Sequence, residues 1–237
     1  DDETRQLLVI LENLKGDYAL RVVYSALLTQ SQLQQNVLND ILIGAKRISS
    51  DYEMRVLLES VLNKGLEQRQ LDDGLFATLL TLSETIDSDY EMRVLLSSAL
   101  DQKGLSDQSQ TRLMAIAKAQ ISSDYELRVL IVKFTIRNAD SAVAIQSAID
   151  ALGSVQSDYE QRVAITNIAR DAKLDNNGWL SLISSVSDIS SDKEASDTLL
   201  VLLNNMPEEP NLRQALSQAA DDGISSKQEL SRVKEAL

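Results

Sequence analysis

The sequence predicts an all-α protein, a right-handed α-solenoid of about six helix-pair repeats of 34–38 residues. Two observations carry this prediction: one motif recurs along almost the whole chain, and most copies contain a signal for the start of a helix. The full motif reads Ser-Asp-Tyr-Glu-x-Arg-Val, and its second position falls at residues 17, 51, 89, 124, 158, 192 and 227. A regular period of this length is typical of arrays in which every repeat contributes one pair of helices.

Six copies open with a capping box, the Ser-x-x-Glu pattern that marks a helix N-terminus. In the copy at Ser50, we expect the serine hydroxyl to accept from the amide of Glu53 while the Glu53 carboxylate reaches back to the Ser50 amide. Such a cap contributes about 1 kcal/mol. The boxes are Ser50/Glu53, Ser88/Glu91, Ser123/Glu126, Ser157/Glu160, Ser191/Glu194 and Ser226/Glu229. The copy with Gly16 and Ala19 lacks the box.

The repeats follow one another directly, because no Pro-, Gly- or Ser-rich linker divides the chain. We therefore expect a single repeat domain, 1–237, although this length exceeds the commonest size of a compact domain. Its units are 17–50, 51–88, 89–123, 124–157, 158–191 and 192–226, with partial caps at 1–16 and 227–237. The 192–226 unit has Lys193, Ser196 and Asp197 where full copies have Tyr, Arg and Val, which suits a capping repeat whose outer face meets water.

Each repeat continues with a second helix, and in four of them apolar residues recur at i, i+3, i+4 and i+7. This spacing predicts one buried helical face. The sets are Leu38/Ile41/Leu42/Ala45, Phe76/Leu79/Leu80/Ser83, Ile145/Ala148/Ile149/Leu152 and Trp179/Leu182/Ile183/Val186. Trp179 is thus interpreted as a core residue rather than as a platform for a ligand. The motif helices have a wider stripe, for example Tyr125, Val129, Leu130, Ile131 and Phe134, and are expected to be buried on more than one side.

Composition excludes several classes of function. The 237 residues include 23 Lys plus Arg and 36 Asp plus Glu, a formal net charge of −13, and neither Cys nor His. The acidity argues against nucleic-acid and anionic-membrane surfaces as partners and suits a neutral or basic one better; the alternative, which we favour, is that the charge serves solubility alone. Without Cys and His we expect no metal centre, no cofactor and no catalytic residue. No apolar run approaches the about 20 residues of a membrane span.

The stretch 175–178, Asp-Asn-Asn-Gly, matches a calcium loop poorly. The first ligand would be Lys173 and the bidentate acid would be Ser184. We interpret the stretch as a turn that opens the helix of Trp179, and we assign no metal ligand.

Stacked motif helices bring their tyrosines into one row and their arginines into another. We interpret most of these residues as a structural ladder: Tyr18, Tyr52, Tyr90, Tyr125, Tyr159, Arg21 and Arg162. In a ladder, Tyr packs its ring with the hydroxyl free, and Arg pairs with an acid four residues before it, as Asp51 lies before Arg55, or with the next repeat. The competing interpretation is that part of the arginine row faces a partner; the candidates are Arg55, Arg93 and Arg128.

Helix pairs of about 35 residues, with an Asp four residues before Arg-Val, resemble the HEAT-like class of α-solenoids over residues 17 to about 189. The phrase Ser-Ser-Asp-Tyr-Glu-x-Arg also resembles repeats of bacterial extracytoplasmic proteins, some attached to membrane-bound sensor metallopeptidases. The second resemblance implies a location outside the cytoplasm. It implies no catalytic residue, because the chain has no zinc-binding motif.

These observations favour a non-enzymatic interaction or scaffold module that binds a protein partner along the solenoid surface. The alternative is a regulatory or sensor module that holds a small ligand or a cation between repeats. A cavity lined by convergent polar groups would favour the second function over the first.

Overall fold

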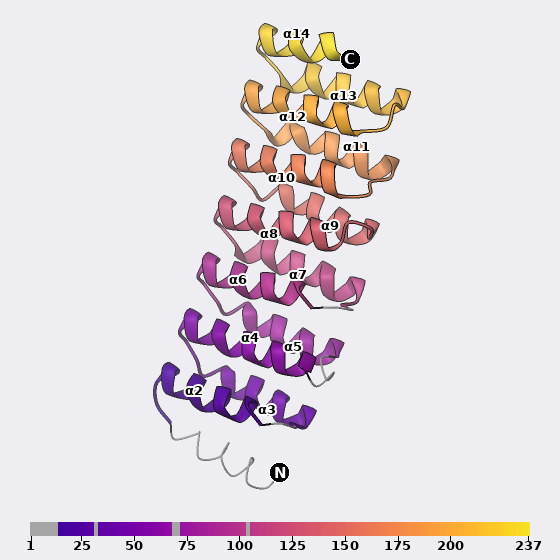
Figure 1. Ribbon diagram of the computed structural model, residues 1–237. Coiled ribbons are helices and arrows are strands. Elements are labelled where there is room, and N and C mark those ends of the chain that lie inside the picture. Colours follow the sequence, from indigo (N-terminus) through magenta and orange to yellow (C-terminus); the bar gives the residue numbers. More distant parts are fainter. Residues whose placement is uncertain (1–13, 31–32, 68–71, 103–104) are drawn as a thin grey trace. The chain divides into compact units, whose positions relative to one another are not determined.

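The computed structural model describes residues 14–30, 33–67, 72–102 and 105–237 (Figure 1). These residues form thirteen α-helices and one 3₁₀-helix, with no strand among them. The all-α prediction is therefore confirmed, and helices that follow one another in the sequence pack as in an α-solenoid. Residues 1–13 of the predicted partial cap 1–16 lie outside the described residues.

The chain divides into two compact units, Asp1–Ser109 and Gln110–Leu237. The boundary falls inside helix α7 (Asp107–Gln120). The expectation of a single domain over 1–237 stays a prediction.

The N-terminal unit consists of two layers of helices. The motif helices form one layer: α2 (Asp17–Leu28), α4 (Asp51–Glu67) and α6 (Asp89–Leu100), with α4 packed against both neighbours. The second helices α3 (Gln35–Ala45) and α5 (Asp73–Ser83) pack against each other and against α4. Every repeat thus contributes one helix to each layer, as the period predicts.

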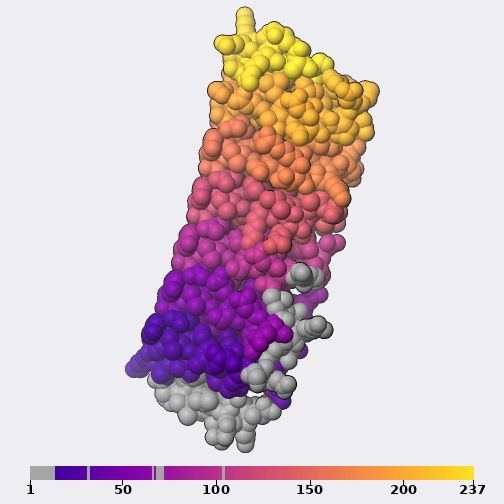
Figure 2. All heavy atoms as spheres, in the orientation of Figure 1, coloured from indigo at the N-terminus to yellow at the C-terminus, as the bar shows by residue number. Residues whose placement is uncertain are grey.

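The C-terminal unit repeats this arrangement. Its motif layer is α8 (Asp124–Arg137), α10 (Asp158–Asp171), α12 (Asp192–Asn205) and α14 (Lys227–Ala236). Its second layer is α9 (Ala142–Leu152), α11 (Asn176–Ser184), continued by the 3₁₀-helix η1 (Ser185–Asp188), and α13 (Pro210–Gly223). Consecutive helices of each layer are in contact, and Figure 2 shows the atoms of these helix pairs meeting without a break.

The core lies between the two layers. All four predicted apolar sets of the second helices are buried, from Leu38 in α3 to Val186 in η1, and Trp179 is a core residue as predicted. The aliphatic residue two positions before each cap is buried as well: Ile48, Ile86, Ile121, Val155, Ile189 and Ile224. The 3.6-residue periodicity therefore located the core of the second layer correctly.

The motif helices are buried less widely than predicted. Leu130, Ile131 and Phe134 are fully buried in α8, whereas Tyr125 is exposed and Val129 is half-buried. The prediction was wrong for Tyr125 because an apolar stripe does not show where the facing helices stop. Where a motif helix has the tyrosine, its first turn carries that side chain on the solvent side.

Two helices begin with capping residues that the motif did not predict. Gly16 precedes α2 with φ of +100°, a conformation that L side chains rarely adopt, so the missing serine reflects a backbone requirement. Helix α11 begins at Asn176, so most of the stretch expected as a turn already belongs to the helix. There the Asp175 carboxylate caps the helix by accepting from the Gly178 amide at 2.8 Å.

Candidate protein-binding surface

The predicted capping boxes are half formed within each repeat. The Ser157 hydroxyl accepts from the Glu160 amide at 3.4 Å, as expected. The Ser157 amide, however, donates to Asp124 Oδ2 of the preceding repeat at 2.8 Å. The preceding repeat thus supplies the carboxylate that the box assigned to Glu160.

The same aspartate link recurs in both units. Asp17 accepts from Ser49 and Ser50, Asp51 from Ser88, Asp124 from Gln156 and Ser157, Asp158 from Ser190 and Ser191, and Asp192 from Ser225 and Ser226. The hydrogen bond from the Ser49 hydroxyl, helped by the backbone amides, lowers the pKa of Asp17 below its ordinary value. Each link fixes the start of one motif helix to the start of the one before it.

The glutamate released from the box pairs with an arginine of the preceding repeat. Arg21 Nε donates to Glu53 Oε2 at 2.6 Å, and Arg128 Nε donates to Glu160 Oε2 at 2.7 Å. Arg55 forms the same pair with Glu91, and Arg162 with Glu194. The pair with Glu53 raises the pKa of Arg21 above its ordinary value.

Arg55 has two acidic partners, and neither is the Asp51 expected from the sequence. Besides Glu91 it contacts Glu59 on its own helix, with Nη1 and Oε2 2.5 Å apart. The carboxylate of Asp51 instead meets the next repeat at Ser88. The i, i+4 spacing correctly marked both side chains as paired, but it assigned Asp51 to the wrong partner.

Each motif tyrosine lies against the arginine three residues later. The guanidinium carbon is 4.8–5.2 Å from the ring centroid in all five cases: Tyr18/Arg21, Tyr52/Arg55, Tyr90/Arg93, Tyr125/Arg128 and Tyr159/Arg162. Such stacking contributes about 0.5–1 kcal/mol at exposed sites. The arginine is therefore held from one side by a glutamate and from the other by an aromatic ring.

The tyrosines form the exposed part of this arrangement. Exposed fractions are 66% for Tyr18, 52% for Tyr52, 54% for Tyr90 and 55% for Tyr125 and Tyr159. By contrast, the side chains of Arg21, Arg55, Arg128 and Arg162 are 15–28% exposed. We call these tyrosines the tyrosine row: Tyr18, Tyr52 and Tyr90 in the N-terminal unit, and Tyr125 and Tyr159 in the C-terminal unit.

A valine extends each member of the row. Val22, Val56 and Val94 follow their tyrosines by four residues on the same helix face; Val22 is exposed, and Val56 and Val94 are intermediate in burial. The expectation of a ladder did not include them. The sequence marks these residues by the Val that closes the motif, but that Val was interpreted as part of the buried stripe.

The row ends at the 192–226 repeat. Lys193 replaces the tyrosine and pairs with Asp197, with Nζ and Oδ2 2.8 Å apart. Asp197 also accepts from Arg232 of α14 at 2.6 Å. In this last pair the acid lies on the earlier helix and the arginine on the later one, the reverse of the pairs described above. Ser196, which replaces the arginine, is fully buried, so this repeat does not simply turn a polar face to water.

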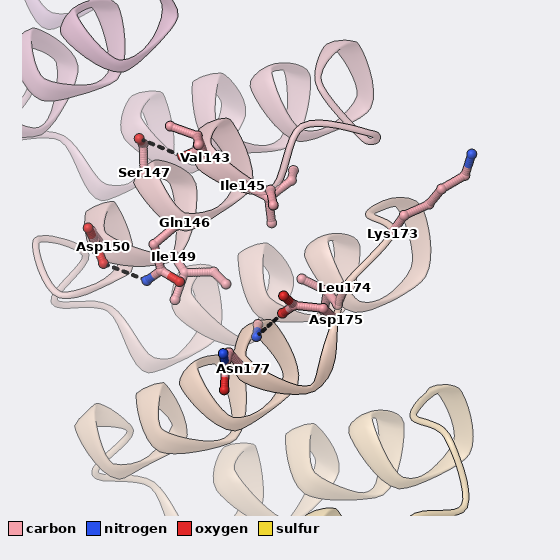
Figure 3. Close-up of a pocket in the computed structure, with 12 residues that line it drawn as sticks. Val143, Ile145, Gln146, Ser147, Ile149, Asp150, Lys173, Leu174, Asp175 and Asn177 are labelled. Carbon is pink, nitrogen blue, oxygen red and sulfur yellow. Dashed lines mark hydrogen bonds between the residues drawn. The ribbon is translucent and has the colours of Figure 1, made fainter. Parts of the chain in front are cut away.

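A second feature is a cavity of about 440 Å³ in the second layer of the C-terminal unit (Figure 3). It lies between α9 and the loop that leads into α11. Val143, Ile145, Ile149 and Leu174 form its apolar wall. A small molecule of modest polarity has room there.

Five polar side chains at this cavity are engaged with the protein. Gln146 donates to Asp150 at 2.9 Å, Asp175 caps α11, and the Ser147 hydroxyl donates to the Val143 carbonyl at 3.1 Å (Figure 3). Lys173 extends away from the cavity and pairs with Asp140. The polar groups therefore do not converge on one point inside it.

Comparison with models of known protein families and with curated proteins finds no match. The resemblance to HEAT-like repeats stays a prediction. No helix among the described residues combines the length and apolar character needed to cross a membrane. The described residues also contain no group of three or more acidic side chains placed to hold a metal ion.

Proposed function

We propose that this protein is a non-enzymatic interaction module that binds a protein partner along its motif helices. The observation that carries the proposal is the tyrosine row. The same large side chain is exposed at the same position of successive helices, while the charged groups beside it are engaged within the protein.

Tyrosine suits this role because of its shape and chemistry. It offers a large apolar face and a hydroxyl group at a low cost in conformational entropy, and it is enriched among the residues that dominate protein interfaces. Within each unit, the tyrosine row presents such groups on neighbouring helices at an open surface. An open, repeated surface is better suited to another protein than to a small substrate.

The arginine candidates play a supporting part in this proposal. A partner that took the guanidinium of Arg55 or Arg128 would have to displace an acid that already contacts it. Arg93 lies against the ring of Tyr90. We therefore assign direct partner contact to the tyrosines, and we assign the arginines to holding the rings and linking the repeats.

The charge of the surface favours a basic partner. Each full copy of the motif carries two carboxylates and one guanidinium, for example Asp51, Glu53 and Arg55. The whole chain has a formal net charge of −13. Complementary potential speeds encounter and suppresses wrong partners.

The test replaces Tyr18, Tyr52 and Tyr90 by Ser together. Partners captured from a native extract by the wild type are identified, and their affinity for both proteins is measured. We expect binding to be lost while the melting temperature falls by no more than about 10 °C, the loss that three ring–guanidinium contacts imply. The matched control is Ile43→Ser, which removes an exposed apolar residue from the second layer and should keep binding.

Two results would contradict the proposal. Equal affinity of the triple variant and the wild type would show that the partner lies elsewhere. A large fall in melting temperature, with affinity reduced only in proportion, would show that the row is a structural ladder alone.

A small-ligand sensor is the second candidate, supported by the cavity between α9 and α11. A ligand bound there would raise the melting temperature by mass action. Val143→Trp places a larger side chain at the cavity wall and should abolish that shift. A compound that stabilises the wild type and this variant equally would place the ligand elsewhere.

A further inference from the structure

The tyrosine row of the N-terminal unit repeats at the spacing of its helices. Tyr18, Tyr52 and Tyr90 are each the second residue of α2, α4 and α6, which pack in that order. Axes of packed helices lie about 8–10 Å apart. Side chains at equivalent positions are therefore presented at about the same interval.

Few backbone conformations match that interval. In a β-strand, residues on one face recur every two positions, about 6.7 Å. An α-helix presents one face every turn, about 5.4 Å, so only every second turn would meet a tyrosine. A polyproline II helix has three residues per turn and rises about 3.1 Å per residue, so one face recurs every about 9.3 Å.

The chemistry of the row also fits a polyproline II segment. Such a segment has no internal hydrogen bonds, so its carbonyl groups are open to donors. The exposed hydroxyl groups of Tyr18, Tyr52 and Tyr90 are donors at matching intervals. Proline rings pack on aromatic side chains in known grooves of this kind, and the adjacent valines extend the apolar surface.

The charge of the row indicates which residues should accompany the prolines of such a ligand. The steps of Tyr52 and Tyr90 each carry one net negative charge, since Asp51 and Glu53, for example, outnumber Arg55. Asp17 and Arg21 balance at the Tyr18 step, so the row as a whole is negative. A ligand with Lys or Arg in every turn would complement the row. The prolines of the chain itself flank Glu208 and Glu209, so a second copy offers the wrong charge.

We propose that the tyrosine row of the N-terminal unit binds a proline-rich segment in the polyproline II conformation, with one basic residue in each turn. This inference rests on the proposed function and names its ligand. The N-terminal unit is the site because it has three tyrosines in succession. In the C-terminal unit the row has two tyrosines and then Lys193, which would repel a basic ligand.

The test measures binding of a labelled peptide with five Pro-Pro-Arg triplets to the full chain by fluorescence anisotropy. Two control peptides separate charge from conformation. Gly-Ser-Arg triplets have the same charge but do not favour polyproline II, and Pro-Pro-Glu triplets favour polyproline II but have the opposite charge. We expect the first peptide to bind at least about tenfold more tightly than either control. Equal binding of the Arg peptides would mean attraction by charge alone and would overturn the inference, as would equal binding of the Glu peptide.

Variants locate the site. Tyr52→Phe keeps the ring over Arg55 and removes only the hydroxyl, so peptide affinity should fall severalfold with an unchanged melting temperature. Tyr159→Phe makes the same change in the C-terminal unit and should bind as the wild type does. Equal losses in both variants, or no loss in either, would contradict the assigned site.

The outcome is separable from that of the proposed function. If the triple tyrosine variant loses its native partner while the proline-rich peptide fails to bind the wild type, the interaction surface stands and the ligand class is wrong. Tighter binding of an α-helical peptide with the same charges would likewise overturn the polyproline II assignment.

Discussion

The two layers of helices are held together in different ways. From α2 to α6 and from α8 to α12, successive motif helices share the same contacts: an aspartate that accepts from the next cap, an arginine that pairs with the next glutamate, and a tyrosine against that arginine. The second helices share apolar packing, but their polar contacts change from step to step. Gln35 donates to Asp72, Ser106 and Ser109 donate to Asp73, and Asn211 donates to Asn176.

This difference explains why only one half of each repeat is recognisable in the sequence. Hydrogen bonds and ion pairs require particular atoms at particular distances, so the motif residues must recur. Apolar packing requires volume and a matching face, and Phe76, Ile145 and Trp179 fill equivalent positions. The second layer is also where the cavity lies, next to the short helix α11.

The largest effect is expected from the second layer, because its stability depends on burial. Leu182→Ala removes a fully buried side chain of α11 and should lower the free energy of unfolding by about 2–5 kcal/mol. Leu180→Ala on the same helix is the control, since Leu180 is only partly buried. Denaturant titration measures both, and similar losses would contradict the assignment of the buried face.

The ion pairs of the motif layer should have an intermediate effect. Arg128→Met leaves Glu160 partly buried without its partner and should cost about 1–3 kcal/mol, between the values for exposed and buried pairs. A double-mutant cycle with Glu160→Gln isolates the coupling between the two side chains. A coupling energy indistinguishable from zero would show that this layer, too, is held by packing alone.

Substitution at one motif position should raise the free energy of unfolding instead of lowering it. Gln161 in α10 is 1% exposed, and its amide has no hydrogen-bond partner among the described residues. Met54, Met92 and Leu127 occupy the equivalent positions of other repeats. Gln161→Met should therefore raise the free energy of unfolding by about 1 kcal/mol. A loss of stability or of partner binding would instead assign the amide a role.

The smallest effect should come from acid titration of the aspartate link. Since hydrogen bonds lower the pKa of Asp17 in the folded state, its contribution is complete above the unfolded value of about 3.9 and is lost as the pH falls through the folded pKa. Wild type should be more stable than Asp17→Asn at about pH 6, and the difference should shrink as the pH falls below the unfolded value and through the lower folded pKa. A constant difference across this range would mean that the charge of Asp17 is not what stabilises the link.

Much of the fold was predictable because it depends on neighbours within one helix. The Ser-x-x-Glu pattern located the motif helices, and Phe76, Ile145 and Trp179 marked equivalent core positions on the second helices. The candidate site was predicted less well. The arginines at Arg55 and Arg128 were singled out for a partner, yet the structure places acids against both.

The sequence by itself determined the repeat period, the helix pairs and the buried face of the second layer, because these follow from spacing along the chain. Only the tertiary structure decided which acid meets which amide or guanidinium, and that the tyrosines are exposed. Within one helix, Asp51 and Glu59 are both close to Arg55 in sequence, and spacing cannot choose between them and Glu91 on another helix. The packing of successive motif helices makes that choice, because it sets the distances between their side chains.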